Sequence, residues 1–283
     1  MSKYYYLIAG LPELSLDDNK LSYTVSTFRE ELYPQLSTKD QKLIDLFYLK
    51  YDNENLITLL ANPDQDIESI GLYTKDQLLD LIASVKYADE MEAPKGALSY
   101  MLRFLTNYFS DAYADEVVLP ENILTSLYYE YALNTKNKFV RSWFGFNQNI
   151  NNLFIALSAR KHDFKFRDQI IGSDYVADQI KNSNARDFGL SSSLDYFNTV
   201  VRFIDEEDLS NREKMIDQMR WAWMEEITFF NYFTIERIFV FLLQIDMIQR
   251  WLKLDKEEGN KYFRKIISSL KDEVQLPLEF RQK

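Results

Sequence analysis

The stretch YDNENLITLLA at residues 51–61 returns in altered form as QNINNLFIALS at residues 148–158. Both copies place polar residues before a run of apolar residues with helical spacing. The matching pairs are Asn55 and Asn152, Leu56 and Leu153, Leu60 and Leu157, and, slightly upstream, Phe47 and Phe144. The chain therefore contains one helical phrase twice, with an offset of 97 positions.

The match continues beyond these two stretches. Ile70-Gly71 and Asp76-Gln77-Leu78 follow the first copy, and Ile171-Gly172 and Asp178-Gln179-Ile180 follow the second. Repeated order of this kind indicates that one helical unit has been used again. A chance alignment of two amphipathic helices is the other interpretation, but the shared order of Asn-Leu and Ile-Gly favours duplication. We therefore expect residues 42–80 and 139–181 to superpose as helix–turn–helix units.

Composition favours long helices joined by short turns. The 283 residues are 46% apolar and 27% charged, which is ordinary for a globular protein, and only 7 are glycine and 6 proline. We predict a single all-α, multi-helix protein built from pseudo-repeated helical subdomains. The repeat units are expected at about 37–95 and 120–190, followed by a long-helix region at 191–283. One short strand at Tyr4–Ile8 is possible, with a helix start as the alternative.

Several local patterns predict where helices begin. Ser37 precedes one helix, and Thr74 with Gln77 forms a capping-box pattern before another. Pro94 and Pro120 are each expected to open a further helix.

The last third of the chain is the most helical by pattern. Residues 211–255 contain neither glycine nor proline and predict one long helix, with a bend whose place the sequence does not mark. Gly259 is expected to separate that helix from a final one at residues 262–270.

Charge and cysteine content exclude several classes of function. The net charge is −11, and no run of Lys and Arg resembles a nucleic-acid-binding stripe, so no nucleic-acid partner is expected. The absence of cysteine excludes disulfides, thiolate metal sites and thiol nucleophiles. No stretch reaches the roughly 18 apolar residues of a membrane span. A cytoplasmic protein, peripheral to a membrane at most, is therefore expected.

Candidate catalytic residues are few. His162, the single histidine, adjoins Asp163, but neighbours on a helix do not face each other, and His162 is expected beyond the end of a helix begun at Asn149. The acidic run at residues 205–208 resembles the magnesium motif of all-helical prenyl-transferring enzymes, yet a second such run is missing. It is better interpreted as a loop before a helix that begins near Ser210.

Other known site patterns are also missing. Glu225, Glu226 and Glu236 lack the Glu-x-x-His pairs of di-iron bundles. Phosphate-cradling loops, dinucleotide-binding glycine patterns and nucleophile elbows are absent from the sequence. We therefore predict no catalytic, cofactor-binding or metal-binding residues and no cofactor.

Aromatic residues are abundant. The chain has 4 Trp, 19 Tyr and 20 Phe, about 15% of the total. Tyr and Trp are favoured at protein interfaces because they bury a large area with few rotatable bonds. A partner-binding surface is therefore predicted, with Trp221 and Trp223 as candidate interface residues. For each ring taken singly, ordinary core packing is the alternative.

The repeated phrase resembles the family of central-stalk proteins of V-type and A-type rotary ATPases that is designated C, or d. The residues that carry the resemblance are Asp52, Asn55, Leu56, Leu60 and Gly71 in the first copy and Asn149, Ile150, Leu153 and Gly172 in the second. The opening YYYLIAGLPELSLDD is also similar to an uncharacterised bacterial family that accompanies V-type ATPase genes. Two departures stand out: Ile155 occupies a position that is often basic, and a third copy is legible only around residues 236–238.

This resemblance implies a fold and a role. Three pseudo-equivalent subdomains would form a funnel that joins the central-stalk subunits of a V-type ATPase to its membrane rotor ring without catalysis. The isolated protein would be a monomer, and Asn55 and Asn152 would be helix-start or turn residues that satisfy backbone donors. The alternative is a stand-alone helical enzyme or ligand carrier with an aromatic-lined pocket. Convergent polar groups with perturbed pKa values would favour that alternative.

Overall fold

The computed structural model describes residues 4–88, 91–110 and 119–273, with side chains up to residue 256. The described residues are helical and contain no strand, so the all-α prediction is confirmed. Eleven α-helices follow one another in the described chain: α1 Tyr5–Ala9, α2 Val25–Thr27, α3 Thr38–Ala61, α4 Lys75–Lys86, α5 Ser99–Phe109, α6 Pro120–Leu133, α7 Lys138–Lys161, α8 Tyr175–Asn182, α9 Phe197–Ile204, α10 Leu209–Ile227 and α11 Ile235–Glu273.

The two copies of the repeated phrase lie in α3 and α7, which have 24 residues each. Each long helix begins at a capping side chain, Ser37 or Asn137, whose oxygen accepts a backbone N–H of the first turn. A loop containing Gly71 or Gly172 then leads to a shorter helix, α4 or α8, which is capped in turn by Thr74 or Asp174. Both copies therefore share one order of capped long helix, glycine loop and capped short helix.

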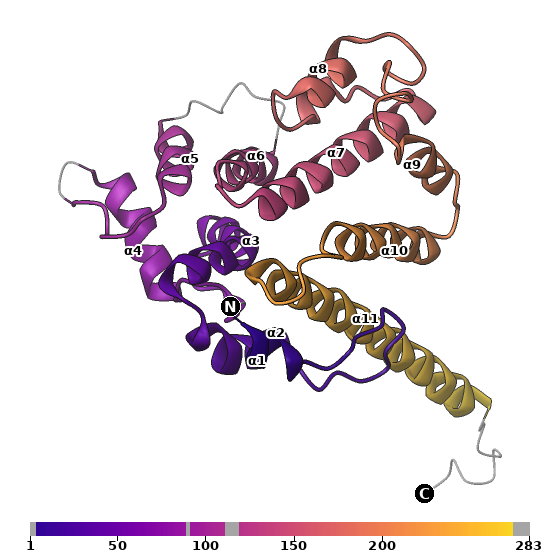
Figure 1. Ribbon diagram of the computed structural model, residues 1–283, viewed down its shortest axis with the longest axis horizontal. Helices are drawn as coiled ribbons and strands as arrows, with labels where there is room; N and C mark the ends of the chain where they lie inside the picture. Colours follow the sequence, from indigo (N-terminus) through magenta and orange to yellow (C-terminus); the bar gives the residue numbers. More distant parts are fainter. Residues whose placement is uncertain (1–3, 89–90, 111–118, 274–283) are drawn as a thin grey trace, which may run out of the picture.

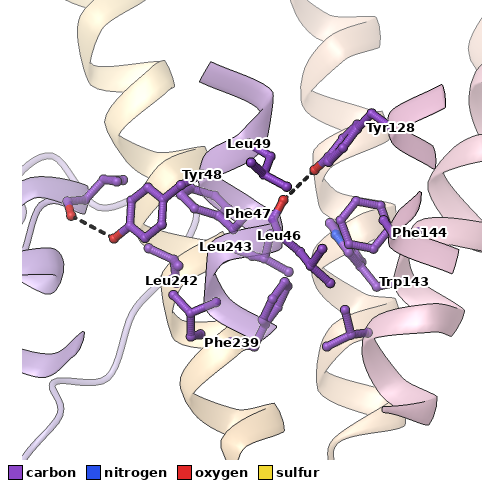
Figure 2. Close-up of a cluster of buried hydrophobic side chains, with 14 of the residues drawn as sticks. Leu46, Phe47, Tyr48, Leu49, Tyr128, Trp143, Phe144, Phe239, Leu242 and Leu243 are labelled. Carbon is purple, nitrogen blue, oxygen red and sulfur yellow. Dashed lines mark hydrogen bonds between the residues drawn. The ribbon is translucent and has the colours of Figure 1, made fainter. Parts of the chain in front are cut away.

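α6 packs against both α3 and α7, and α11 runs past α3 and α10 (Figure 1). The main core lies where these helices meet. Figure 2 shows α3 side chains there beside those of α6, α7 and α11, with Tyr48 on the side of α3 away from Tyr128 and its hydroxyl directed to the Val25 carbonyl at 3.5 Å. The Tyr128 hydroxyl donates to the Leu46 carbonyl at 2.6 Å, so the buried phenol keeps a partner. A second apolar cluster fills the space among α7, α8 and α9.

Four predicted helix starts are confirmed, and two are wrong. Helices begin as predicted at Ser37, Thr74 and Pro120, and α10 begins at Leu209, next to the predicted Ser210. α5 begins at Ser99 and not at Pro94, because Gly96 takes a positive φ of 89° and turns the chain first. α7 begins at Lys138 and not at Asn149, since Asn137 provides the cap.

The expected single helix over residues 211–255 is two helices. α10 ends at Ile227, and the Thr228 side chain donates back to the Met224 carbonyl at 2.6 Å. α11 then returns antiparallel to α10, as the bond of 3.0 Å between Arg237 and Glu225 shows. Burial of both helices against the core makes this hairpin more favourable than one extended helix.

Of the two alternatives given for Tyr4–Ile8, the structure has the helix, since residues Tyr5–Ala9 form α1. One further expectation is corrected. Gly259 does not end a helix, and α11 continues through it to Glu273. A single glycine in a helix costs only about 1 kcal/mol relative to alanine, which neighbouring turns can offset.

Candidate functional site

In the first copy, two side chains of α3 hold the loop that follows the helix. Asn55 donates to the Glu68 carbonyl at 2.9 Å and accepts the Glu68 N–H at 3.0 Å. One turn earlier, Asp52 accepts the backbone N–H groups of Leu72 and Tyr73 at 2.9 and 3.0 Å. These two buried side chains therefore act as a clamp on the loop.

The second copy clamps its loop in the same way. Asn152 of α7 donates to the Ile171 carbonyl at 2.7 Å and accepts the Ile171 N–H at 2.9 Å. Gln148 adds a bond to the same carbonyl at 3.1 Å. Asn149, the sequence match of Asp52, takes no part in these bonds, and its side-chain oxygen is buried without a partner among the described residues. Asn55 and Asn152 lie inside their helices and are not helix-start residues, but they do satisfy backbone donors.

The two repeat glycines allow the clamps to close. A Cβ at Gly71 would lie 2.2 Å from Oδ1 of Asp52, and a Cβ at Gly172 would lie 1.9 Å from Nε2 of Gln148. Gly172 also has a φ of 89°, which L side chains rarely adopt. The repeat leucines have a different role, because Leu56 and Leu153 are fully buried in the core and Leu60 and Leu157 pack against it.

The clamp at Asp52 predicts a pH dependence of stability. Burial raises the pKa of Asp52 to about 6, against the opposing effect of the bonds from the Tyr73 and Leu72 N–H groups. The folded state then holds this proton more tightly than the unfolded state, so stability falls as the pH rises from about 4 to about 6. Urea unfolding of the parent and the Asp52→Asn variant should show the parent losing stability relative to the variant in this window only. The opposite slope would mean that the backbone bonds outweigh burial.

His162 lies at the carboxyl end of α7, exposed, with its backbone N–H bonded to Ser158 and Ala159. His162→Ala should change the free energy of unfolding by no more than about 0.5 kcal/mol, because its side chain is not buried. A thermal or urea unfolding curve of the variant checks this expectation, and a loss of more than about 1 kcal/mol would contradict it.

The α3 and α7 helices also line a central cavity of about 280 Å³, together with α6, α10 and α11. Two matched pairs of the repeat face it: Phe47 with Phe144, and Lys50 with Asn147. The remaining lining residues are Tyr128, Tyr129, Trp143, Asp217, Arg220, Phe239, Leu243, Asp246, Met247 and Arg250. The duplicated helices α3 and α7 therefore both line the cavity, and each contributes residues at matched positions of the repeat.

Charged side chains of the cavity are joined in ion pairs. Lys50 lies 2.6 Å from Asp246. Asp217, which is 1% exposed, accepts from Arg220 at 3.3 Å, from Arg250 and from the Trp251 indole N–H at 2.9 Å. Buried carboxylates need such partners, so Asp217 organises the contact between α10 and α11.

Tyrosines of the cavity are held neutral. Burial raises the pKa of Tyr128 and of Tyr129 above the usual phenol range. Outside the cavity lining, burial and the nearby Asp246 carboxylate also raise the pKa of Tyr51. These phenols therefore serve as hydrogen-bonding and packing groups near neutral pH.

The two candidate interface tryptophans are half-buried. The Trp223 ring stacks on Phe146 with centroids 4.8 Å apart and also contacts Phe139 and Trp143. Trp221 packs against the main core. Trp223 is therefore part of the packing between α7 and α10, and its role at an interface stays a prediction.

Sequence reasoning missed the part of the most exposed aromatic group that lies at residues 229–232. Tyr5 and Tyr6 of α1 and Phe229, Phe230 and Tyr232 between α10 and α11 are 49–90% exposed. We call these five residues the aromatic surface. The run FFNYF at residues 229–233 was a visible signal, but the expectation of one long helix, with a bend at no marked place, concealed it.

In the described part of the chain, no three or more His, Asp or Glu side chains are grouped so that they could hold a metal ion. None of the helices in that part has the length and apolarity needed to cross a membrane.

Comparison with known proteins gives one match. A family model described as "Protein of unknown function (DUF2764)" matches residues 1–274, which is nearly the whole chain. The chain belongs to this family. No curated protein and no solved structure matches it.

Proposed function

We propose that this member of the DUF2764 family is a non-catalytic coupling subunit of a V-type or A-type rotary ATPase. It would sit at the cytoplasmic side of the membrane and join the central-stalk subunits to the membrane rotor ring. The resemblance of the repeated phrase to the C (or d) stalk proteins of these machines suggests the partner. The observation that carries the proposal is the aromatic surface, which offers that partner a place to bind.

The aromatic surface has the features of a protein interface. Phe230 and Tyr6 are 82% and 90% exposed, although aromatic rings of this size are normally covered. The Tyr5 ring contacts Phe233 at 4.6 Å, so the surface joins α1 to the α10–α11 loop. Such a surface is assembled from distant parts of the chain and can be covered by one partner.

The two clamps support a mechanical role. A part that transmits torque must resist bending, and loops are ordinarily the softest parts of a fold. Here Asn55 and Asn152 fasten the loops after α3 and α7 directly to those helices. The repeat therefore contributes stiffness, which a coupling subunit needs more than reactive side chains.

Affinity purification from native membranes tests the proposal. The tagged parent should recover ATPase stalk and ring subunits in fixed stoichiometry. The Phe229→Ser, Phe230→Ser double variant should stay folded, because both rings are exposed, and should lose at least ten-fold in recovered subunits. Phe164→Ser is the matched control, since Phe164 is 70% exposed but lies outside the aromatic surface.

The purification experiment tests the coupling function and the role of the aromatic surface separately. Failure of the parent to recover ATPase subunits would reject the coupling function. Normal recovery by the double variant would remove the aromatic surface from the interface. The second candidate function is ligand binding, which the central cavity favours.

A further inference from the structure

We propose that the central cavity binds a small organic anion, in which a carboxylate or phosphate group is attached to a flat apolar body. This inference goes beyond the coupling function and does not depend on it. It rests on the charges, the unused hydrogen-bond donors and the aromatic wall of the cavity.

In each ion pair of the cavity the cation is more exposed than the carboxylate that it contacts. Lys50 is 36% exposed and its partner Asp246 23%, whereas Arg250 and Arg220 are 44% and 19% exposed and their partner Asp217 1%. The cavity lining contains these three cations and two carboxylates, and within each pair the basic group is nearer to anything that enters. In a chain with a net charge of −11, this is a local reversal of sign.

The guanidinium of Arg220 has N–H donors that make no hydrogen bond to the described residues. A guanidinium carries five N–H donors in a rigid fork, and the hydrogen bond found for Arg220 is a long one of 3.3 Å to Asp217. Its Nε is buried without a partner among the described residues, so the guanidinium is poorly satisfied. The terminal nitrogens of the guanidinium can donate to a carboxylate or phosphate oxygen in the cavity, which would be a charge-assisted hydrogen bond.

Asp217 is one buried carboxylate between two guanidinium groups. This carboxylate is shared by Arg220 and Arg250, and the second acidic neighbour of Arg250, Glu213, lies at 3.7 Å and is 48% exposed. Glu213 can therefore turn towards solvent when another anion approaches. The arrangement leaves room for a ligand charge without breaking the buried pairs.

The apolar wall sets the shape of the ligand. Phe47, Trp143, Phe144 and Phe239 line the cavity, and the Lys50 ammonium lies 4.4 Å from the centre of the Phe47 ring. Flat ligands pack well on such rings. The volume of about 280 Å³ is near the lower end of the roughly 300–1,000 Å³ of ligand pockets, so the ligand is small.

Isothermal titration calorimetry of the full chain tests the inference, with benzoate and phenyl phosphate as probes. We expect saturable binding of one molecule per chain for at least one probe, at least ten-fold tighter than acetate or inorganic phosphate. Benzyl alcohol, which has the ring without the charge, should not bind. Comparison of the two probes distinguishes a carboxylate site from a phosphate site.

Substitutions in the cavity lining test whether the probe binds in the central cavity. Arg220→Gln should weaken the preferred probe at least ten-fold, and Lys50→Gln tests the same cavity if the first variant is unstable, since Asp246 keeps its bond from Tyr51. Arg103→Gln is the matched control, because it removes a cation from an exposed ion pair. The inference is overturned if the parent binds neither probe, if benzyl alcohol binds equally well, or if both cavity variants bind like the parent.

Discussion

Replacing Asp217 by alanine is expected to lower the free energy of unfolding by about 3 kcal/mol. Removal of one partner of a buried ion pair typically costs about 3–5 kcal/mol, because the remaining charge is left without compensation. Arg220 and Arg250 would both lose their carboxylate, and the Trp251 N–H would lose its acceptor. Since Arg250 is 44% exposed and can turn to water, the lower end of that range applies.

A matched substitution separates this effect from the loss of any acidic residue. Glu130→Ala removes the partner of Arg103, but that pair is 60% and 58% exposed and should contribute no more than about 1 kcal/mol. Urea unfolding of both variants at one pH measures the difference. Equal stabilities would show that Asp217 does not organise the α10–α11 contact.

Removal of the Asn152 clamp is the second substitution with a large expected effect on the free energy of unfolding. Asn152→Ala should lower the free energy of unfolding by about 2 kcal/mol, because a buried polar group left unpaired costs about 1–3 kcal/mol and the Ile171 N–H loses its acceptor, whereas the Ile171 carbonyl keeps its bond from Gln148. Asn55→Ala should cost less, about 1–2 kcal/mol, since its partner Glu68 is exposed and water can replace the lost bonds.

The neighbouring asparagine provides the control. Asn151 is half-buried, and its amide makes one long bond of 3.4 Å to the Tyr129 hydroxyl. Asn151→Ala should therefore change stability by less than about 1 kcal/mol. Hydrogen exchange at residues 168–174 should also rise in Asn152→Ala and not in Asn151→Ala. A cost at Asn151 equal to that at Asn152 would argue against a clamp.

The clamps show that the repeat located two equivalent structural units, although the role predicted for its asparagines at helix starts or turns was wrong. The paired Asn-Leu and Ile-Gly signals pointed to two equivalent units, and each asparagine binds the backbone beside an Ile-Gly loop. Their position inside a helix was not predicted, because asparagine ordinarily favours helix starts and turns. The bonding partners lie 13 and 19 residues further along the chain. Only the folded loop brings them within reach.

The candidate cavity was less visible in the sequence. The match of Phe47 with Phe144 was present, but Asp217, Arg220 and Arg250 gave no pattern of their own. These three residues meet because α10 and α11 form an antiparallel hairpin. Without the position of the break at residues 228–234, their proximity could not be derived.

The sequence by itself determined the helical class and the boundaries that depend on local chemistry. Ser37, Thr74 and Pro120 begin helices because a capping oxygen or a fixed φ acts on the nearest turn, within a few residues. The tertiary structure decided where the helix after Asp208 breaks and which aromatic rings are exposed. Burial against other helices sets these outcomes, and the free energy of that burial depends on neighbours distant in the chain.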